Sequence, residues 1–366
     1  MTELKQLYKP LPPNSTIGII GGGQLARMLA SSAAKLGFRT IVLEPQENFP
    51  AAQLCNRQIV GAYDDETALA ELIEACDVVT YEFENVPLSA AHYIETRRPL
   101  YPPSEALRVS QDRLVEKDFL RANGVGVVDY RAIESIEDLR TGLKEFDGGV
   151  LKTRRFGYDG KGQHVFSNSD VTDDIRLEAT LNELGGSDCV LEKLVDFEFE
   201  FSIIAFRGQD KSVSAFWPSE NIHESGILRK SSPAVRLSDE LHSTASRHIG
   251  TILGALNYKG VLGVEFFAAQ NAVLVNEIAP RVHNSGHWTV EVCAKSQFDA
   301  HILAITGLKG GNISPRQDYE MINLLGHEAD DIAEYLDTPD TYVTLYGKLE
   351  SRPGRKMGHL TRLLKR

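Results

Sequence analysis

Residues 261–280 read VLGVEFFAAQNAVLVNEIAP, two apolar runs that each contain one glutamate, Glu265 and Glu277. Apolar runs of this length separated by a few polar residues are typical of a β-hairpin. A three-residue loop at Gln270–Ala272 would place the two carboxylates directly opposite each other, whereas a two-residue turn would put them on opposite faces. Two opposed acids among apolar neighbours are costly unless a cation lies between them, and Mg²⁺, which prefers oxygen ligands, fits such a pair. The alternative interpretation is a pair of exposed acids at a sheet edge.

A glycine-rich segment upstream, FGYDGKGQ at 156–163, directly follows LKTRR at 151–155. Its glycines give a mobile backbone that is able to lie over a polyphosphate. The segment is not a Walker A loop, because no Gly-Lys-Ser or Gly-Lys-Thr ends it. A solvated basic hairpin is the alternative interpretation. The cations that the sequence brings to this place are Lys152, Arg154, Arg155 and Lys161.

A second glycine turn, Gly21–Gln24, lies between a predicted strand at 16–20 and a predicted helix at 25–36. Such a turn lets the backbone approach an anion and directs the N–H groups of a helix N-terminus toward it. Gly21, Gly23 and Ala26, with Glu44 as a ribose acceptor, also match the dinucleotide fingerprint. A nicotinamide-dependent oxidoreductase and a tight turn without any ligand therefore remain alternatives.

The order of predicted elements divides the chain into an α/β part and an α+β part. Strands at 39–43, 58–60 and 78–81 alternate with a helix at 66–76, which predicts an N-terminal parallel sheet up to the proline-rich stretch 98–103. A helix at 105–122 follows, and then come a strand at 197–206, a helix at 238–256 and strands at 261–268, 273–278, 321–325 and 342–345. We predict three domains, at 1–105, 106–305 and 306–366, of which the last is small and β-rich.

The composition of the 366 residues narrows the class of protein. The net charge of −12 argues against a nucleic-acid partner and against an anionic membrane surface. The four cysteines include no C-x-x-C pair, which favours reduced thiols over a disulfide framework. The N-terminal MTELKQLYKPLPP has no apolar core of signal-peptide type, and no run of 18 apolar residues occurs. These features predict a cytoplasmic protein without a membrane partner.

Four motifs, in this order along the chain, resemble those of the N5-carboxyaminoimidazole ribonucleotide synthetase family, which belongs to the ATP-grasp superfamily. They are YEFENVP at 81–87, GYDGKGQ at 157–163, NEIAPRVHNSGHWT at 276–289 and RPGRKMGH at 352–359. The resemblance implies a pre-ATP-grasp domain, an ATP-grasp domain and a homodimer. It also implies a ligase of de novo purine (IMP) biosynthesis that uses ATP, Mg²⁺ and bicarbonate to carboxylate 5-aminoimidazole ribonucleotide through carboxyphosphate.

The resemblance assigns residues to ATP and metal. Glu265 and Glu277 match the magnesium ligands, and Ala279 stands where many relatives have an asparagine. Glu200 matches the carboxylate that contacts the ATP ribose. The residues that match the remaining nucleotide contacts are Arg113, Lys152, Gly157, Tyr158, Asp159, Gly160, Lys161, Gly162, Gln163, Glu192, Lys193, Leu194, Val195, His223 and Asn276.

The second substrate is assigned in the same way. Arg281 suits an anion because its planar fork fits carboxylate or phosphate. His283 is a candidate for moving a proton, and Asp159 is the competing candidate for contacting the amine. The residues that match the environment of the ribonucleotide and of carboxyphosphate are Gln24, Glu82, Tyr158, Asp159, Arg281, His283, Asn284, Ser285, Lys348, Arg355 and Lys356. The glycine turn is expected to donate N–H groups to the 5′-phosphate.

Other activities remain as alternatives. A related ATP-grasp purine ligase that uses formate and a biotin-type carboxylase share the fold. A nicotinamide oxidoreductase would leave the paired glutamates and the second glycine loop without a purpose. A binding-only homologue would have no need of its metal ligands.

Overall fold

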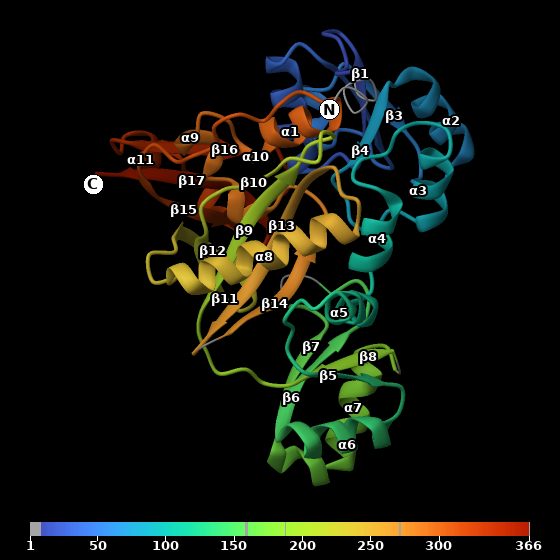
Figure 1. Cartoon of the computed structure of the whole chain (residues 1–366), viewed down its shortest axis with the longest axis vertical. Coiled ribbons are helices and arrows are strands. Elements are labelled where there is room, and N and C mark those ends of the chain that lie inside the picture. Colours follow the sequence, from blue (N-terminus) through green and yellow to red (C-terminus); the bar gives the residue numbers. More distant parts are fainter. Residues whose placement is uncertain (1–8, 158–159, 187, 271, 366) are drawn as a thin grey trace, which may run out of the picture.

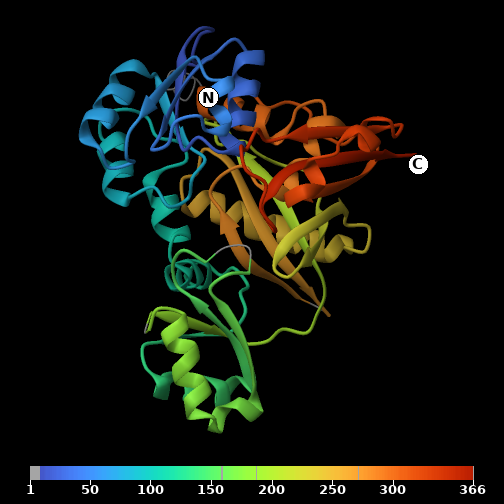
Figure 2. The same ribbon diagram turned by 180° about the vertical axis from the view of Figure 1, so that it is seen from behind.

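The computed structural model describes residues 9–157, 160–186, 188–270 and 272–365. Residues 1–8 of the N-terminal segment, the expected site residues Tyr158 and Asp159, and Asn271 of the expected hairpin loop lie outside these ranges. Figures 1 and 2 show an upper body that contains both ends of the chain and a smaller lobe below it. The lobe carries β6 and β7, the strands on either side of the glycine-rich segment.

The N-terminal domain has the predicted parallel sheet, in the order β3-β2-β1-β4. The apolar strands are buried on both faces, as expected for a parallel sheet between helices. Gly37 ends the first helix with a φ of 79°, as its position in the sequence predicts. The elements of this domain are β1 (Thr16–Ile20), α1 (Gln24–Lys35), β2 (Arg39–Glu44), η2 (Pro50–Gln53), β3 (Arg57–Val60), α2 (Glu66–Ala75), β4 (Val78–Tyr81) and α3 (Leu88–Glu95).

The single helix predicted at 105–122 is wrong, because the structure has two helices there. They are α4 (Ser104–Ser110) and α5 (Arg113–Ala122). The break occurs because Asp112 leaves the helical conformation and caps α5 with its side chain, which accepts from the N–H groups of Leu114 and Val115. The break turns α5 toward the two sheets that carry the candidate site (Figure 1).

The lower lobe is an antiparallel sheet, in the order β5-β8-β6-β7, with helices packed on it. Leu151 and Leu191 from the sheet pack with Leu139 and Leu177 from the helices in a separate core. The lobe therefore has its own hydrophobic core and carries the glycine-rich segment on a rigid support. Its elements are β5 (Tyr130–Ile133), α6 (Ile136–Phe146), β6 (Gly148–Thr153), β7 (Gln163–Ser167), η3 (Asn168–Thr172), α7 (Asp174–Glu183) and β8 (Cys189–Glu192).

A larger antiparallel sheet forms the centre of the molecule. Among the described residues it has the order β14-β13-β9-β11-β12-β15-β17-β16, with β10 paired to β9. The C-terminal strands join this sheet through the β12–β15 pairing and do not form a sheet of their own. Its elements are β9 (Phe197–Arg207), β10 (Val213–Ala215), β11 (Ser219–Glu224), β12 (Ile227–Pro233), β13 (Gly260–Ala269), β14 (Ala272–Ala279), β15 (Asp318–Leu325), β16 (Thr341–Leu345) and β17 (Lys356–Leu364).

Helices cover both faces of this sheet. Ile203 of β9 packs toward α8 (Asp239–Ala255), whereas its neighbour Ile204 packs into the core that contains α10 (Gln297–Thr306). His301 of α10 hydrogen-bonds Thr80 of β4 at 2.8 Å and accepts from the N–H of Val261 of β13 at 3.1 Å, so the N-terminal domain is fixed to the central sheet. The remaining short elements are η4 (Asn284–Gly286), α9 (Thr289–Val292), η5 (Gly326–Ala329) and α11 (Ala333–Leu336).

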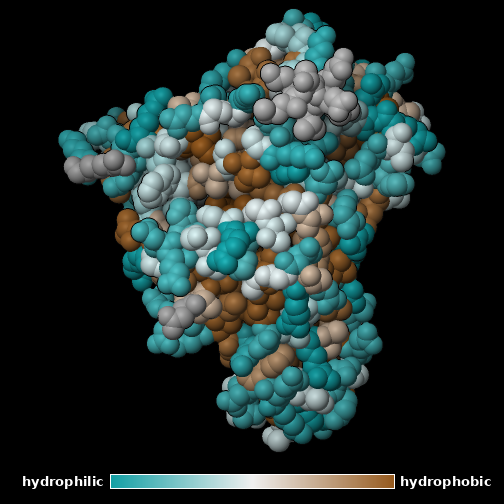
Figure 3. Space-filling model, viewed as in Figure 1, coloured by the Kyte–Doolittle hydropathy of each residue, from teal (hydrophilic) through white to brown (hydrophobic). Residues whose placement is uncertain are grey.

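The face seen in Figure 3 is mostly hydrophilic, with apolar patches near its middle. In the part of the chain that the structure describes, no helix is long and apolar enough to cross a membrane.

Candidate active site

Glu265 of β13 lies directly opposite Glu277 of β14, although the strands are not joined by the three-residue loop that was one of the two alternatives. Ala269 pairs with Ala272, which leaves only two positions in the turn. A regular ladder from this turn would place Glu277 across from Val264, on the other face. A β-bulge between Phe266 and Glu265 adds one residue to β14 and restores the Glu265–Glu277 pair. The extra residue of this bulge is Asn276.

The two carboxylates titrate differently. Burial, together with the neighbouring Glu277, raises the pKa of Glu265 to about 7. Burial also acts on Glu277, but Arg113 and Lys152 outweigh it and lower the pKa of that carboxyl. The side chain of Glu277 is 38% exposed and that of Glu265 only 13%. Glu277 is therefore the charged and more exposed carboxylate of the pair, whereas the more buried Glu265 has the raised pKa.

A second group of charges is held by the lower lobe. The Lys152 Nζ of β6 lies 2.8 Å from the Glu192 Oε2 of β8, and the Lys117 Nζ of α5 lies 3.4 Å from Glu192 Oε1. Burial alone would raise the pKa of Glu192, but Lys152 and Lys117 lower it to about 2. Glu192 is therefore a buried anion that orients two cations. Arg113 of α5 completes the link to the central sheet, since its Nη1 lies 3.4 Å from Glu277 Oε2.

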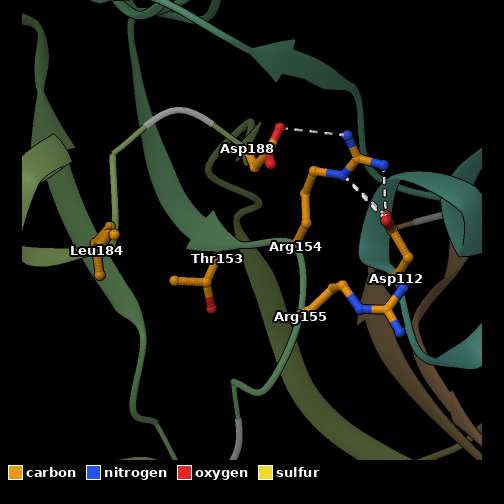
Figure 4. A pocket seen from close by; sticks show the side chains of 7 residues that line it. Asp112, Thr153, Arg154, Arg155, Leu184 and Asp188 are labelled. Atoms are coloured by element: carbon orange, nitrogen blue, oxygen red, sulfur yellow. Dashed lines mark hydrogen bonds and ion pairs between the residues drawn. The ribbon is translucent and has the colours of Figure 1, made fainter. Parts of the chain in front are cut away.

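Arg154 is not one of the cations available to a phosphate, in contrast to the prediction. Its guanidinium donates to Asp112 at 2.6–3.1 Å and lies 3.9 Å from Asp188 (Figure 4). The carbonyl of Arg154 also accepts from the N–H of Arg113 at 2.9 Å. Arg154 thus anchors the N-terminus of α5, while Arg155 contacts Gln111 at 3.0 Å. The charge of Arg154, which lines the pocket in Figure 4, is consequently already neutralised by Asp112.

The glycine-rich segment approaches the central sheet. Gly160 and Gly162 have φ values of 75° and 73°, which favour glycine. A Cβ on Gly160 would lie 2.9 Å from the Cα of Gly226 in the β11–β12 turn. The segment therefore reaches from the lower lobe to the β11–β12 turn of the central sheet. The N–H of Thr153 donates to the carbonyl of Gly162 at 2.8 Å and closes its base.

Several residues that were expected to contact the nucleotide already have partners within the protein. Glu200 of β9 lies 2.7 Å from His223 of β11, and this pairing raises the pKa of His223 against the effect of burial. Residues 192–195, which the resemblance assigns to the nucleotide, follow the same pattern. The N–H of Lys193 already donates to the carbonyl of Asp129 at 2.8 Å. That N–H is therefore not available to an adenine edge. The Leu194 side chain is 47% exposed at the start of the following loop.

Two of the residues expected around the second substrate lie where they can act. Arg281 Nε lies 2.8 Å from Glu84, and the side chain of Arg281 is 20% exposed. His283 is buried, and burial together with Arg281 and Lys356 lowers its pKa well below the usual range, so its ring is neutral. Its Nδ1 lies 2.9 Å from Ser285 Oγ, and its Nε2 lies 3.7 Å from Glu265. His283 thus lies between Glu265 and Ser285.

Asn284 is a support within the protein. Its side chain exchanges two hydrogen bonds with Asn323 of β15, at 2.7 and 2.9 Å, and is buried. Ser285 likewise accepts from Ser202 of β9 at 2.7 Å and is fully buried. Both contacts fix the loop after β14 onto the central sheet. In the same loop the side chain of Arg281 is 20% exposed and that of His283 11% exposed.

The N-terminal glycine turn differs from the expectation as well. The N–H of Gly22 donates to Glu44 at 2.8 Å, and that of Gly23 donates to Glu82 at 2.7 Å. Carboxylates thus occupy the amides that were expected to face a phosphate. Glu44 also accepts from Tyr63 at 2.7 Å, so it is not free for the ribose of a dinucleotide. Gln24 begins α1 at the edge of this turn.

Cations from the C-terminal strands lie near the same turn. Burial raises the pKa of Glu82, while the N–H of Gly23 and the charges of Arg281 and Lys348 oppose this rise without reversing it. Lys348 Nζ donates to the carbonyl of Lys356 at 2.6 Å, and Arg355 donates to the carbonyl of Glu350 at 2.9 Å. The C-terminal strands therefore bring positive charge to the carboxyl end of the N-terminal sheet.

The sequence prediction missed Lys117, Glu84 and the bulge at Asn276. Glu84 was visible in the motif YEFENVP, but nothing in the sequence indicates that it pairs with Arg281. Lys117 follows Arg113 by four residues, which places both on one face of a helix, and this spacing was the available signal.

Two antiparallel sheets, a glycine-rich segment that reaches between them and two carboxylates on adjacent strands define an ATP-grasp protein. Family models described as "ATP-grasp domain", "Ribonucleotide synthetase preATP-grasp domain" and "Phosphoribosylaminoimidazole carboxylase C-terminal domain" match residues 118–298, 14–111 and 320–366. An N5-carboxyaminoimidazole ribonucleotide synthase from Brucella melitensis is 48% identical over 96% of this chain and 97% of its own. The chain belongs to the N5-carboxyaminoimidazole ribonucleotide synthase family.

Solved structures agree with this assignment. The N5-carboxyaminoimidazole synthetase of Staphylococcus aureus, complexed with ADP, superposes with a TM-score of 0.91 at 37% identity, covering 98% of this chain and 95% of its own. The Aspergillus clavatus enzyme, in complex with ADP and 5-aminoimidazole ribonucleotide, gives a TM-score of 0.87 at 31% identity, covering 96% and 94%.

Proposed function

We propose that the chain is an ATP-dependent ligase that carboxylates 5-aminoimidazole ribonucleotide with bicarbonate in de novo purine biosynthesis. Its products are N5-carboxyaminoimidazole ribonucleotide, ADP and phosphate. The observation that carries the proposal is the Glu265–Glu277 pair beside Arg113 and Lys152, on the central sheet that the glycine-rich segment approaches at Gly160. The Aspergillus clavatus relative, whose structure contains both ADP and the ribonucleotide, supports the choice of substrate.

Mg²⁺ fits the paired glutamates. The described residues contain no group of three or more side chains of metal-binding type, so Glu265 and Glu277 would supply only two oxygen ligands. Mg²⁺ is commonly held by one or two carboxylates while substrate phosphates and water complete its shell. The raised pKa of Glu265 also marks a carboxylate that a cation would neutralise. When bound, the ion would offset negative charge on the phosphate oxygens of ATP.

The reaction requires ATP because bicarbonate is a poor electrophile. A bicarbonate oxygen attacks the γ-phosphorus, the bond from that phosphorus to the ADP oxygen breaks, and carboxyphosphate forms. The amine of the ribonucleotide then takes up the carboxyl carbon, phosphate leaves and the amine loses a proton. Arg113 and Lys152 hold the phosphates, and the glycine-rich segment excludes water. Glu200 and His223 would contact the ribose end of the nucleotide.

The second substrate would lie between the loop after β14 and the N-terminal domain. Arg281 suits the carboxylate or phosphate of the carboxyl donor. We assign proton transfer to His283, because its Nε2 lies 3.7 Å from Glu265 while its Nδ1 is engaged with Ser285. Lys348, Arg355 and Lys356 would hold the 5′-phosphate, and Glu82 lies at the same edge. The glycine turn would donate N–H groups only if Glu44 and Glu82 withdraw from it.

ADP release measured with ATP, Mg²⁺ and bicarbonate, with and without 5-aminoimidazole ribonucleotide, tests the proposal. Strong stimulation by this ribonucleotide and by no other purine intermediate is expected. Stimulation by formate or by another amine would keep the ATP-grasp class and change the enzyme. The absence of ATP turnover under all conditions would contradict the proposed activity.

A cytoplasmic location and a homodimer are further parts of the proposal. The location is supported by the cysteine spacing, which is typical of reduced thiols. The dimer rests on the family resemblance alone. Light scattering of the purified chain would measure its mass, and a monomer would contradict the dimer.

A further inference from the structure

Lys117 of α5 is a buried cation that the proposed reaction does not use. Only 1% of its side chain is exposed. Its Nζ donates to the main-chain carbonyl of Asn276 at 2.9 Å and lies 3.4 Å from Glu192 Oε1. Taking an ammonium group out of water is costly unless its partners compensate for the lost hydration. The two acceptors are therefore the reason that a lysine is tolerated at this position.

Asn276 is the residue that the β-bulge adds to β14. A bulge disrupts the ladder locally, so the extra residue needs a partner from outside the strand pair. Lys117 supplies this partner for the carbonyl of Asn276. The contact spans 159 positions in the sequence, which makes it a purely tertiary interaction.

The bulge decides on which face Glu277 lies. Without it, the two-position turn would place Glu277 across from Val264 and away from Glu265. Arg113, four residues before Lys117 on the same helix face, lies 3.4 Å from Glu277. One face of α5 therefore contacts two consecutive residues of β14, Asn276 through its main chain and Glu277 through its side chain.

We propose that Lys117 is a positioning residue for the divalent-cation site: by holding the Asn276 carbonyl it keeps the bulge that sets Glu277 opposite Glu265. The inference rests on the proposed function of these two glutamates as metal ligands. Lys117 acts through the backbone of β14 and touches neither metal nor nucleotide. Residues that orient metal ligands in this indirect way commonly change metal affinity by roughly 10–100-fold when they are replaced.

Binding of Mn²⁺ to the full chain in the presence of ADP, followed by electron paramagnetic resonance of the free ion, tests the proposal without turnover. Lys117→Met keeps the length of the side chain and removes the donor, and we expect it to weaken Mn²⁺ binding about tenfold or more. ADP binding without metal, measured by calorimetry, is expected to change less than about threefold, because Lys152 still pairs with Glu192. Arg121→Met is the matched control, since Arg121 lies one turn further along α5 and its side chain is 52% exposed.

Lys117→Gln separates the hydrogen bond from the charge. It keeps an N–H donor, so we expect Mn²⁺ affinity within about threefold of the wild type. This result supports the proposal even if the methionine variant does not fold, which circular dichroism would show. Two results would overturn it: wild-type Mn²⁺ affinity in a folded Lys117→Met variant, or equal losses for Mn²⁺ and for metal-free ADP. If the wild-type chain with ADP binds no Mn²⁺, the proposed metal site itself fails.

Discussion

The Nζ of Lys152 and the Oε2 of Glu192 lie 2.8 Å apart across β6 and β8, in the interior of the lower lobe. The sequence indicated Lys152 as a phosphate-binding cation, and the structure adds the anion that holds it in place. Because Glu192 also contacts Lys117, this carboxylate connects the lower lobe to α5. A nucleotide phosphate would meet a cation whose position is already fixed, which reduces the entropy lost on binding.

Replacing Lys152 by methionine is expected to lower ATP turnover roughly 100-fold, because the site loses a fixed charge next to the phosphates. Steady-state ADP release measures the effect. Lys144→Met is the matched control, since Lys144 lies on α6 of the same lobe and is exposed. A Lys152→Met enzyme with turnover close to that of the wild type would contradict the phosphate role.

Glu277→Gln is expected to abolish most of the ATP turnover while the fold survives, because the partly exposed carboxylate contributes charge to the cleft and little to the core. The apparent Mg²⁺ requirement should rise by roughly tenfold or more, as measured by titrating ADP release with Mg²⁺. The matched control is Glu178→Gln on the exposed side of α7. Unchanged Mg²⁺ dependence in Glu277→Gln would remove this residue from the metal site.

Neighbouring arginines should behave differently. Arg154→Met is expected to lower the free energy of unfolding by about 1–3 kcal/mol, because it leaves Asp112 with an uncompensated charge at the start of α5. Arg155→Met loses a single contact with Gln111 and should change stability by less than about 0.5 kcal/mol. Urea unfolding followed by fluorescence compares the two variants. Equal effects would mean that the Arg154–Asp112 pair does not anchor the helix.

Glu116, a buried residue of α5, should make the free energy of unfolding depend on pH. Burial raises its pKa from 4.5 to about 8, so its contribution to stability is complete below pH 4.5 and is lost as the pH rises through about 8. Glu116→Gln cannot ionise and avoids this loss. The melting temperature of the variant relative to the wild type should therefore rise between pH 4.5 and 8 and stay level above that range. A difference that does not vary with pH would contradict the raised pKa.

Much of the candidate site was visible in the sequence because its residues lie in contiguous motifs. The glycine-rich segment FGYDGKGQ and the apolar runs around Glu265 and Glu277 are local patterns that can be recognised from a few adjacent residues. The structure has the corresponding strands β13 and β14. The parallel N-terminal sheet was predictable for the same reason, since strand and helix periods are local properties. The roles of the individual site residues stay predictions.

The sequence did not predict which acidic partner each basic side chain contacts. Lys152 and Arg154 are two positions apart and both carry positive charge, yet Arg154 turns to Asp112 while Lys152 reaches Glu192. Successive side chains of a strand alternate in direction, but the end of β6 lies between these residues, and the partner residues come from other elements. Distant carboxylates, which the local pattern does not contain, decide the outcome.

The sequence by itself determined the alternation of strands and helices in the N-terminal domain, the glycine-rich segment and the presence of two glutamates in one hairpin, because each depends on local periodicity and turn chemistry. Only the tertiary structure decided that the glutamates face each other. The turn alone would have separated them, and one added residue at Asn276 reverses the register. A one-residue shift moves every later side chain of the strand to the other face. This shift is stabilised by groups that are distant in the sequence, here Lys117 and Arg113 of α5, which contact Asn276 and Glu277.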